Sequence, residues 1–197
     1  MTALRGRPCW IFDLDGTLTQ PVHDFDAIRA QLGIPRGELI LEWLATQPPA
    51  VAAPLHDRLA HIEAELVEET VAQPGCASLL EALRSDGCRL GILTRNNRDN
   101  ALRTLERIGV LHCFPEASVL GRDEAPAKPD PGGILRLLDA WGVAPHQAVM
   151  VGDYRLDLEA GRNAGVATAH FDPAAAFPWP DLTDVAVTTL PALLDHR

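Results

Sequence analysis

Several features that mark other protein classes are missing from this chain of 197 residues. No apolar run approaches the roughly 18 residues that a membrane-spanning helix needs. The only apolar segment near the N-terminus is interrupted by Asp13 and Asp15, so it lacks the form of a secretory signal. The four cysteines form no CxxC pair, and Cys9 lies in an apolar context, as reduced core cysteines do. We therefore expect a cytoplasmic protein with no membrane partner.

Positive charge is also scarce. The formal net charge is −10 at pH 7, and Lys128 is the only lysine. This balance argues against nucleic acid or an anionic membrane surface as a partner. The remaining composition, 47% hydrophobic and 22% charged, is ordinary for a globular protein. The length suggests one domain, or one domain with an insertion, and leaves monomer and homodimer both open.

Short apolar runs that end in polar residues alternate with amphipathic patterns along most of the chain. The apolar runs cover residues 9–15, 88–94, 147–153, 166–171 and 185–190. The helical patterns cover residues 77–87, 98–109, 132–142 and 156–165. This alternation predicts an α/β fold with a doubly wound parallel sheet covered by helices on both faces.

Residues 21–73 break this alternation, because they contain no strand-like run. Apolar residues recur there at helical spacing in three stretches, residues 22–32, 39–43 and 55–66. We interpret residues 47–54, QPPAVAAP, as a proline-rich connection between helices. The sequence thus predicts a core of residues 1–20 and 74–197, with a small all-helical insertion at 21–73 after the first strand.

The first strand ends in two carboxylates, Asp13 and Asp15, which point to the same face of an extended chain. In a partly buried site their repulsion is costly, so a bound cation is the simplest compensation. An ordinary acidic turn is the plain alternative. A calcium EF-hand loop is excluded, because Gly16 as its sixth residue would place Ile11 and Val22 at ligand positions.

Other strand ends carry polar residues as well. Asp153 closes the third predicted strand, and Asp157 follows at the start of a helix, where it could simply favour the helix dipole. Thr94 closes the second strand. The polar residues Arg95 and Asn96 then lead into a helix whose N-terminal N–H groups favour anions.

Lys128 lies on a stiff segment between Pro126 and Pro129, where a compact ammonium suits a point contact to phosphate or carboxylate. Ligands of open α/β sheets bind beyond the carboxyl ends of the strands. The acidic oxygens gathered there select a hard cation such as Mg²⁺. The lysine, the Thr94 hydroxyl and the helix N–H groups favour an anion beside it, and a phosphate satisfies both requirements.

Four segments together resemble the ordered motifs of the haloacid dehalogenase superfamily. They are DLDGT from Asp13, the threonine of GILT at Thr94, the lysine of AKPDP at Lys128, and GDYRLD from Asp153 to Asp157. The helical insertion resembles the cap of the subgroup that contains phosphoglycolate phosphatase. The resemblance implies a Rossmann-like, flavodoxin-like core with a mobile cap, and Mg²⁺-dependent hydrolysis of a small phosphorylated metabolite.

The resemblance also implies roles for single residues. Asp13 would be the nucleophile that forms an aspartyl-phosphate, and Asp15 would protonate the leaving alcohol and then activate water. Asp13, Asp153 and the backbone carbonyl of Asp15 would bind the metal. Phosphoryl oxygens would be held by Thr94, the backbone N–H of Arg95, and Lys128. The supporting positions are Gly16, Thr17, Asn96 and Asp157.

Asp15 separates the candidate activities. A halide leaves without a proton, whereas an alkoxide needs an acid, worth typically about 10²–10⁴-fold, so Asp15 favours a phosphatase over a dehalogenase. A phosphonoacetaldehyde-type hydrolase needs a cap lysine, which residues 21–73 lack. A phosphosugar mutase of the β-phosphoglucomutase type stays open as the alternative, and a non-catalytic metal- or phosphate-binding regulator is less favoured. The insertion is shorter than typical phosphoglycolate phosphatase caps, and Arg29, Arg36 and Arg58 are its only strong cations.

Overall fold

The core of the computed structural model, which describes residues 4–197, is a parallel sheet of six strands in the order β3-β2-β1-β4-β5-β6. The strands are β1 Cys9–Phe12, β2 Arg89–Leu93, β3 Val119–Leu120, β4 Ala148–Gly152, β5 Ala167–Phe171 and β6 Val185–Val187. From β1 the chain moves outward to β2 and β3, then returns to build β4, β5 and β6 on the other side. This reversal between β1 and β4 confirms the predicted doubly wound sheet and marks its switch point.

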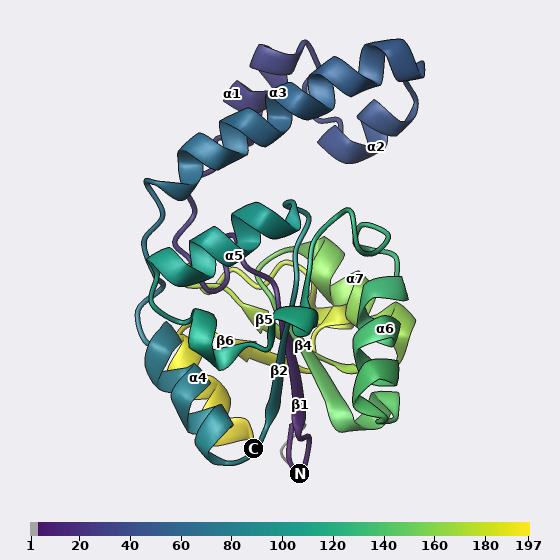
Figure 1. The fold of residues 1–197 in the computed structure, drawn as a ribbon. Helices are drawn as coiled ribbons and strands as arrows, with labels where there is room; N and C mark the ends of the chain where they lie inside the picture. Colours follow the sequence, from purple (N-terminus) through teal and green to yellow (C-terminus); the bar gives the residue numbers. More distant parts are fainter. Residues whose placement is uncertain (1–3) are drawn as a thin grey trace.

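Helices cover both faces of the sheet (Figure 1). On one side lie α4 Cys76–Ser85 and α5 Arg98–Arg107, and on the other α6 Gly132–Trp141 and α7 Arg155–Ala164. Alternate side chains of β1 serve the two layers: Trp10 and Phe12 pack with α4 and α5, whereas Ile11 packs with α6 and α7. Because β1 is buried on both faces, its sequence is a continuous apolar run rather than an alternating one.

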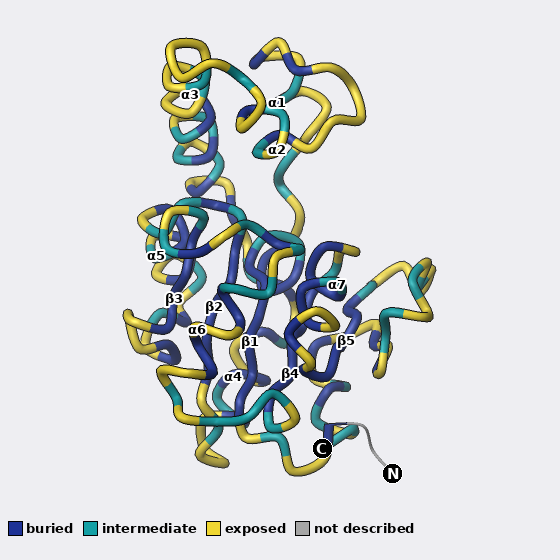
Figure 2. The backbone as a smooth tube through the Cα atoms, turned by 90° about the vertical axis from the view of Figure 1, so that its right-hand side faces the viewer, coloured by how far each residue is buried: buried dark blue, intermediate teal, exposed yellow. Residues whose placement is uncertain are grey.

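Three helices form a separate layer above the sheet, α1 Phe25–Leu32, α2 Ile40–Ala45 and α3 Pro49–Val67. They share a small hydrophobic cluster of their own: Ile28, Leu32, Ile34, Ile40, Leu44 and Leu59. Figure 2 shows that most of this layer is exposed, with short buried stretches between the exposed ones. We propose that residues 21–73 are a cap and that residues 1–20 and 74–197 are the core.

Two adjacent linkers join this cap to the core. Thr19 and Ala72 form an isolated antiparallel bridge, and the Gln20 N–H donates a 2.9 Å hydrogen bond to the Val71 carbonyl. The Gln73 N–H donates to the Leu18 carbonyl at 2.9 Å. The entry and exit of the cap are therefore held together at one place.

The interpretation of residues 47–54 as a connection is wrong, because α3 begins at Pro49 and runs through Pro54. Proline is well tolerated at the first helical position, since that N–H has no partner inside the helix. The Pro48 carbonyl accepts the Ala52 N–H at 2.9 Å and starts the helix before Pro54 is reached. Pro54 removes only one intrahelical hydrogen bond, and the packed apolar face of α3 outweighs that loss.

The sequence patterns gave no sign of β3, which pairs with β2 through Val119 and Leu120. A strand of two residues is too short for a periodic pattern. Among the described residues, the fold also contains five 3₁₀ segments: Leu111–Cys113, Glu116–Ser118, Pro145–Gln147, Pro180–Leu182 and Leu190–His196. Within residues 4–197, no helix has the length and apolar character needed to cross a membrane. The four cysteines are free, as expected.

Candidate active site

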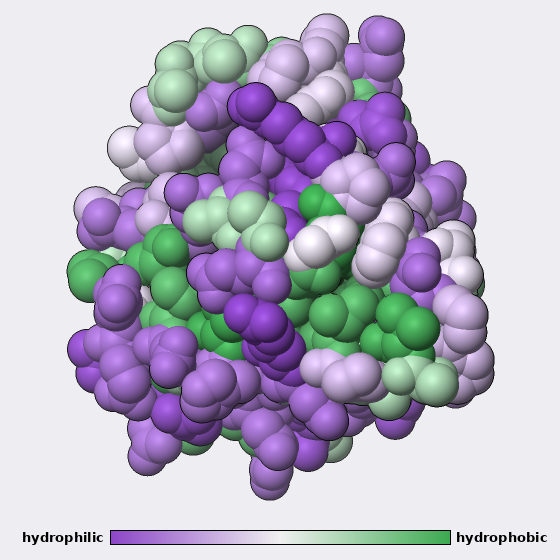
Figure 3. All heavy atoms as spheres, turned by 90° about the horizontal axis from the view of Figure 1, so that it is seen from above, coloured by the Kyte–Doolittle hydropathy of each residue, from purple (hydrophilic) through white to green (hydrophobic). Residues whose placement is uncertain are grey.

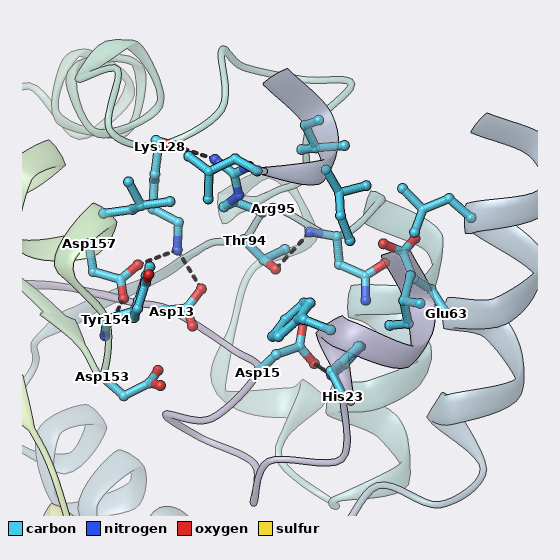
Figure 4. Close-up of a pocket in the computed structure, with 18 of the residues that line it drawn as sticks. Asp13, Asp15, His23, Glu63, Thr94, Arg95, Lys128, Asp153, Tyr154 and Asp157 are labelled. Carbon is cyan, nitrogen blue, oxygen red and sulfur yellow. Dashed lines mark hydrogen bonds and ion pairs between the residues drawn. The ribbon is translucent and has the colours of Figure 1, made fainter. Parts of the chain in front are cut away.

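The carboxyl edge of the sheet brings the predicted site residues together (Figure 4). The Asp13 N–H donates to the Val151 carbonyl at 2.9 Å, which extends the ladder between β1 and β4 by one residue. In the same way the Thr94 N–H donates to the Leu120 carbonyl at 3.0 Å at the end of β2. Asp153 directly follows β4. Each side chain is therefore positioned by a strand that ends immediately before it.

The turn after Asp13 depends on Gly16. Its φ of 89° lies in the left-handed region, and the Leu14 carbonyl accepts the Thr19 N–H at 3.1 Å to close the turn. A Cβ atom on Gly16 would lie 2.6 Å from Oδ2 of Asp153. Thr17 donates a 2.7 Å hydrogen bond to Oδ1 of the same carboxylate. The turn thus makes room for Asp153 and also orients it.

Lys128 is 2% exposed, and its ammonium lies between two carboxylates. It donates to Oδ1 of Asp13 and, at 2.6 Å, to Oδ1 of Asp157. The other oxygen of Asp157 accepts the Tyr154 N–H at 3.0 Å, so this residue also caps α7. Burial by itself lowers the pKa of Lys128, but the two carboxylates outweigh it and raise that pKa above its usual value. Lys128 is therefore charged.

The carboxylates of the site are not fully compensated by this lysine. Burial, together with repulsion from the neighbouring acids, raises the pKa of Asp13 well above its usual range, although Lys128 lowers it. Burial and repulsion from Asp157 likewise raise the pKa of Asp153 to about 7, against the hydrogen bond from Thr17. The cluster therefore has more carboxylates than the one ammonium of Lys128 can neutralise. This excess favours the binding of a further positive charge.

These residues fit a divalent cation. Carboxylate oxygens of Asp13, Asp153 and Asp157 lie within 4.8 Å of one another. Oxygen ligands of this kind suit Mg²⁺. Because one oxygen of Asp157 already binds Lys128 and the other caps α7, Asp13 and Asp153 are the two carboxylates that would hold such a cation directly.

Asp15 lies apart from this carboxylate group and faces the cap. Its Oδ1 is 3.9 Å from Nδ1 of His23, which belongs to the linker before α1. The His23 ring stacks on Phe25, with centroids 5.5 Å apart. The two aspartates of DLDG thus have different neighbours. Asp13 contacts the buried Lys128, whereas Asp15 faces His23 of the cap. His23 was visible in the sequence only as one of several cap histidines, because nothing local pairs it with Asp15.

The loop between β2 and α5 is held by its own side chains. The Thr94 Oγ1 accepts the Asn96 N–H at 3.1 Å, and Asn96 Oδ1 accepts the Asn97 N–H at 2.8 Å. Asn97 caps α5 by accepting the Asn100 N–H at 2.8 Å. In the described part of the chain, the Arg95 N–H has no hydrogen-bond partner, so this donor is free for an anion at the helix N-terminus.

Two of the ion pairs between the core and the cap involve residues that line the site. The Arg95 guanidinium donates to both Glu42 oxygens, at 2.8 and 2.7 Å, and also to the Lys128 carbonyl. Arg122 donates to both oxygens of Glu63 at 2.8 Å. Burial raises the pKa of Glu63 to about 7, although Arg122 opposes this. The sequence patterns missed both glutamates, since partners that distant in sequence leave no local signal.

A cavity of about 360 Å³ lies between the cap and the carboxyl edge of the sheet. Its core side is lined by the acidic cluster, Lys128 and the loop from Thr94 to Asn96. Its cap side is lined mostly by apolar side chains: Phe25, Ile28, Leu39, Ile40, Leu41 and Leu59. This volume is at the small end of ligand sites, about 300–1,000 Å³, and suits a small molecule with one anionic end.

Comparison with known proteins gives a consistent result. A family model described as haloacid dehalogenase-like hydrolase matches residues 9–165. A haloacid dehalogenase-like hydrolase domain-containing protein of Arabidopsis thaliana is 31% identical over 188 residues, covering 89% of this chain and 74% of that protein. A phosphoglycolate phosphatase of Rhodospirillum rubrum is 32% identical over 184 residues, covering 79% and 76%. The crystal structure of a hydrolase from Pseudomonas syringae superposes with a TM-score of 0.77 at 22% identity, covering 96% of this chain and 97% of that one.

Proposed function

The chain belongs to the haloacid dehalogenase-like hydrolase family, and from this premise we propose that it is an Mg²⁺-dependent phosphatase of small phosphomonoesters. The observation that carries the proposal is that the two aspartates of DLDG, Asp13 and Asp15, have different surroundings. Asp13 is held by Lys128 next to Asp153, whereas Asp15 faces the cap, where the alcohol part of a substrate would lie. A nucleophile and an acid need these two different surroundings.

In the proposed reaction an Asp13 carboxylate oxygen attacks phosphorus, and the bond between phosphorus and the alcohol oxygen breaks. Asp15 gives its proton to that oxygen as it leaves, so the alcohol departs neutral. Asp15, now ionised, then takes a proton from water as the water attacks the aspartyl-phosphate. Phosphate leaves and Asp13 is regenerated.

Phosphoryl transfer depends mainly on alignment and charge neutralisation. We assign the phosphoryl oxygens to the Thr94 hydroxyl, the Arg95 N–H and the Lys128 ammonium, because all three line the same end of the cavity. Asp13, Asp153 and the Asp15 backbone carbonyl would hold Mg²⁺, which supplies further neutralisation of the phosphoryl charge when bound. Gly16, Thr17, Asn96 and Asp157 hold these groups in place.

Residues 21–73 have the role of a cap in this proposal. They supply the apolar wall of the cavity and contact Asp15 through His23. Closure over the site excludes water from the phosphoryl group before transfer. The paired linkers act as the hinge of this closure. The ion pairs of Glu42 with Arg95 and of Glu63 with Arg122 stabilise the closed position.

A phosphosugar mutase of the β-phosphoglucomutase type would share the nucleophile and the acid. The absence of lysine from residues 21–73 and the apolar wall of the cavity disfavour it, because a sugar needs polar partners. A regulator that only binds metal or phosphate would not need Asp15 beside the cap. The hydrolase proposal accounts for both aspartates.

Product analysis tests the proposal. The purified protein with Mg²⁺ should release inorganic phosphate from p-nitrophenyl phosphate and from alkyl phosphates. Asp13→Asn should abolish the release. Turnover that survives this substitution would contradict the covalent route, and an isomerised sugar phosphate made without free phosphate would indicate the mutase.

A further inference from the structure

The cap-side wall of the cavity offers apolar surface that is open to solvent. Phe25 is 52% exposed and Leu39 is 36% exposed, and both line the cavity from the cap. Tyr154, 51% exposed, lines it from the core. Seen from above, the molecule is mostly hydrophilic, with hydrophobic side chains gathered in patches across the middle of this face (Figure 3). Large apolar side chains left open at a cavity favour apolar ligand groups.

The cations near this wall are already neutralised by the protein. Arg95 makes its two-pronged contact with Glu42. Arg29 donates to Asp26 at 2.7 Å and to the Glu38 carbonyl at 3.3 Å. In the part of the chain that the structure describes, the Nε atom of Arg29 has no hydrogen-bond partner, and this atom is buried. Neither guanidinium is therefore free for the carboxylate of a substrate.

A carboxyl group also lies on the cap side of the cavity. Glu63 lines the cavity and is only 8% exposed, and Arg122, its ionic partner among residues 4–197, does not line it. His23, the remaining titratable cap residue at the cavity, faces Asp15. A second anionic group on a substrate would meet apolar side chains and a glutamate. Burying an unpaired carboxylate against such a wall is strongly unfavourable.

We propose that this cavity selects phosphomonoesters whose alcohol part is uncharged and largely apolar, and that it discriminates against esters that carry a carboxylate, phosphoglycolate included. The inference rests on the proposed phosphatase activity and names its substrate class. The phosphate binds at the sheet edge, and the alcohol part contacts Phe25, Leu39 and Tyr154. Each added methylene that reaches this wall favours binding by roughly fourfold.

A matched pair of substrates tests the inference. Butyl phosphate and 3-carboxypropyl phosphate have chains of four carbons and differ at the end in a methyl or a carboxylate. With Mg²⁺, we expect kcat/KM for butyl phosphate to be larger by at least about tenfold. Equal values, or a preference for the carboxylate, would overturn the inference while leaving the phosphatase intact. Failure to hydrolyse these esters and p-nitrophenyl phosphate would overturn the proposed function and the inference with it.

A charge substitution tests the physical cause. Glu42→Gln removes the partner of Arg95 and leaves a cation beside the cavity. It should raise the ratio of kcat/KM for 3-carboxypropyl phosphate over butyl phosphate by about tenfold. Glu65→Gln, which removes the same charge from an exposed cap position, is the control and should leave the ratio unchanged.

A second substitution covers the case in which Glu42→Gln disturbs cap closure. Leu39→Arg places a new cation at the exposed wall of the cavity. It should shift the same ratio in the same direction. Both variants must still hydrolyse p-nitrophenyl phosphate for the comparison to be valid. If the ratio is then unchanged in both, the discrimination against carboxylates does not arise from the lack of an unpaired cation at the cavity.

Discussion

The ammonium nitrogen of Lys128 lies 2.6 Å from Oδ1 of Asp157 and also contacts Asp13, so one buried charge joins three segments of the chain. Lys128 comes from the loop before α6, Asp13 from the end of β1, and Asp157 from the first turn of α7. The contact explains why the only lysine of an arginine-rich chain stands here. A compact ammonium fits between two carboxylates where a planar guanidinium would not.

Lys128→Met should remove activity and stability together. The change leaves the Asp13 and Asp157 carboxylates buried without their common partner, which costs about 3–5 kcal/mol for broken buried pairs. We expect kcat/KM to fall by more than about 10²-fold, since a charged donor to the phosphoryl group is lost. Urea unfolding and steady-state kinetics measure the two effects. Lys128→Arg, which keeps the charge, should fold better than Lys128→Met but remain impaired. Full activity of Lys128→Met would remove Lys128 from the site.

Gly16→Ala should destabilise the protein by more than the cost of its backbone conformation alone. The positive φ alone costs an alanine about 1–2 kcal/mol, and the new Cβ would also collide with Asp153. Gly87→Ala is the matched control, because its φ of 77° is similar and a Cβ there meets nothing within 4 Å. Only Gly16→Ala should weaken Mg²⁺ binding, as measured by calorimetry. Equal loss of stability and unchanged metal binding in both variants would contradict the close approach of Gly16 to Asp153.

Stability and metal binding should depend on pH in opposite ways. The pKa of Asp153 is raised from its ordinary value of 3.8 to about 7 in the folded protein. Between these two pH values the folded metal-free protein keeps a proton on Asp153 that the unfolded chain has already lost. The stability of the metal-free protein should therefore fall as the pH rises through this range. Mg²⁺ competes with the same proton, so its affinity should increase with pH. Thermal unfolding with and without Mg²⁺ should show the larger stabilisation at about pH 8 than at about pH 5.5.

Asp153→Asn provides the control for this dependence. The variant should lose most of the Mg²⁺-induced stabilisation and most of its change with pH. A wild-type protein that binds Mg²⁺ equally well at both pH values would contradict the assignment of Asp153 as a ligand that must lose a proton.

Asp15→Asn should affect substrates according to their leaving groups. An alkoxide needs the proton that Asp15 provides, whereas p-nitrophenolate leaves without one. The value of kcat/KM reports the step that forms the aspartyl-phosphate and expels the leaving group, so it separates this role of Asp15 from the later activation of water. We expect kcat/KM to fall by about 10²–10⁴-fold for butyl phosphate and by much less for p-nitrophenyl phosphate. Equal losses for the two esters would assign Asp15 a role other than acid catalysis.

The sequence predicted the sheet and the placement of Asp13, Thr94 and Asp153, because a buried parallel strand has a local signature that ends where its polar residue begins. Lys128 could be singled out by its rarity. Its contact with Asp157 could not, because it joins a loop and a helix that only the tertiary fold brings together. The strand β3 was missed because two residues are too short to give a pattern. The start of α3 at Pro49 was missed because the prolines nearby suggested a connection instead of a helix.

The cap was the least predictable part of the site. Its helices follow from apolar spacing, but the pairing of Glu42 with Arg95 depends on how the cap docks. The same holds for Glu63 with Arg122 and for the approach of His23 to Asp15. Charge pairs between the cap and the core leave no periodic pattern in the sequence.

The covalent role of Asp13 is the central claim, and chemical trapping tests it most directly. Enzyme mixed with Mg²⁺ and excess p-nitrophenyl phosphate is quenched in acid, reduced with borohydride and analysed by fragmentation mass spectrometry. An aspartyl-phosphate is converted by this reduction to homoserine. If Asp13 is the nucleophile, homoserine should appear at position 13 in the wild-type protein, with none at position 15 and none in Asp13→Asn. Rapid turnover with an unmodified Asp13, or homoserine at position 15, would contradict it.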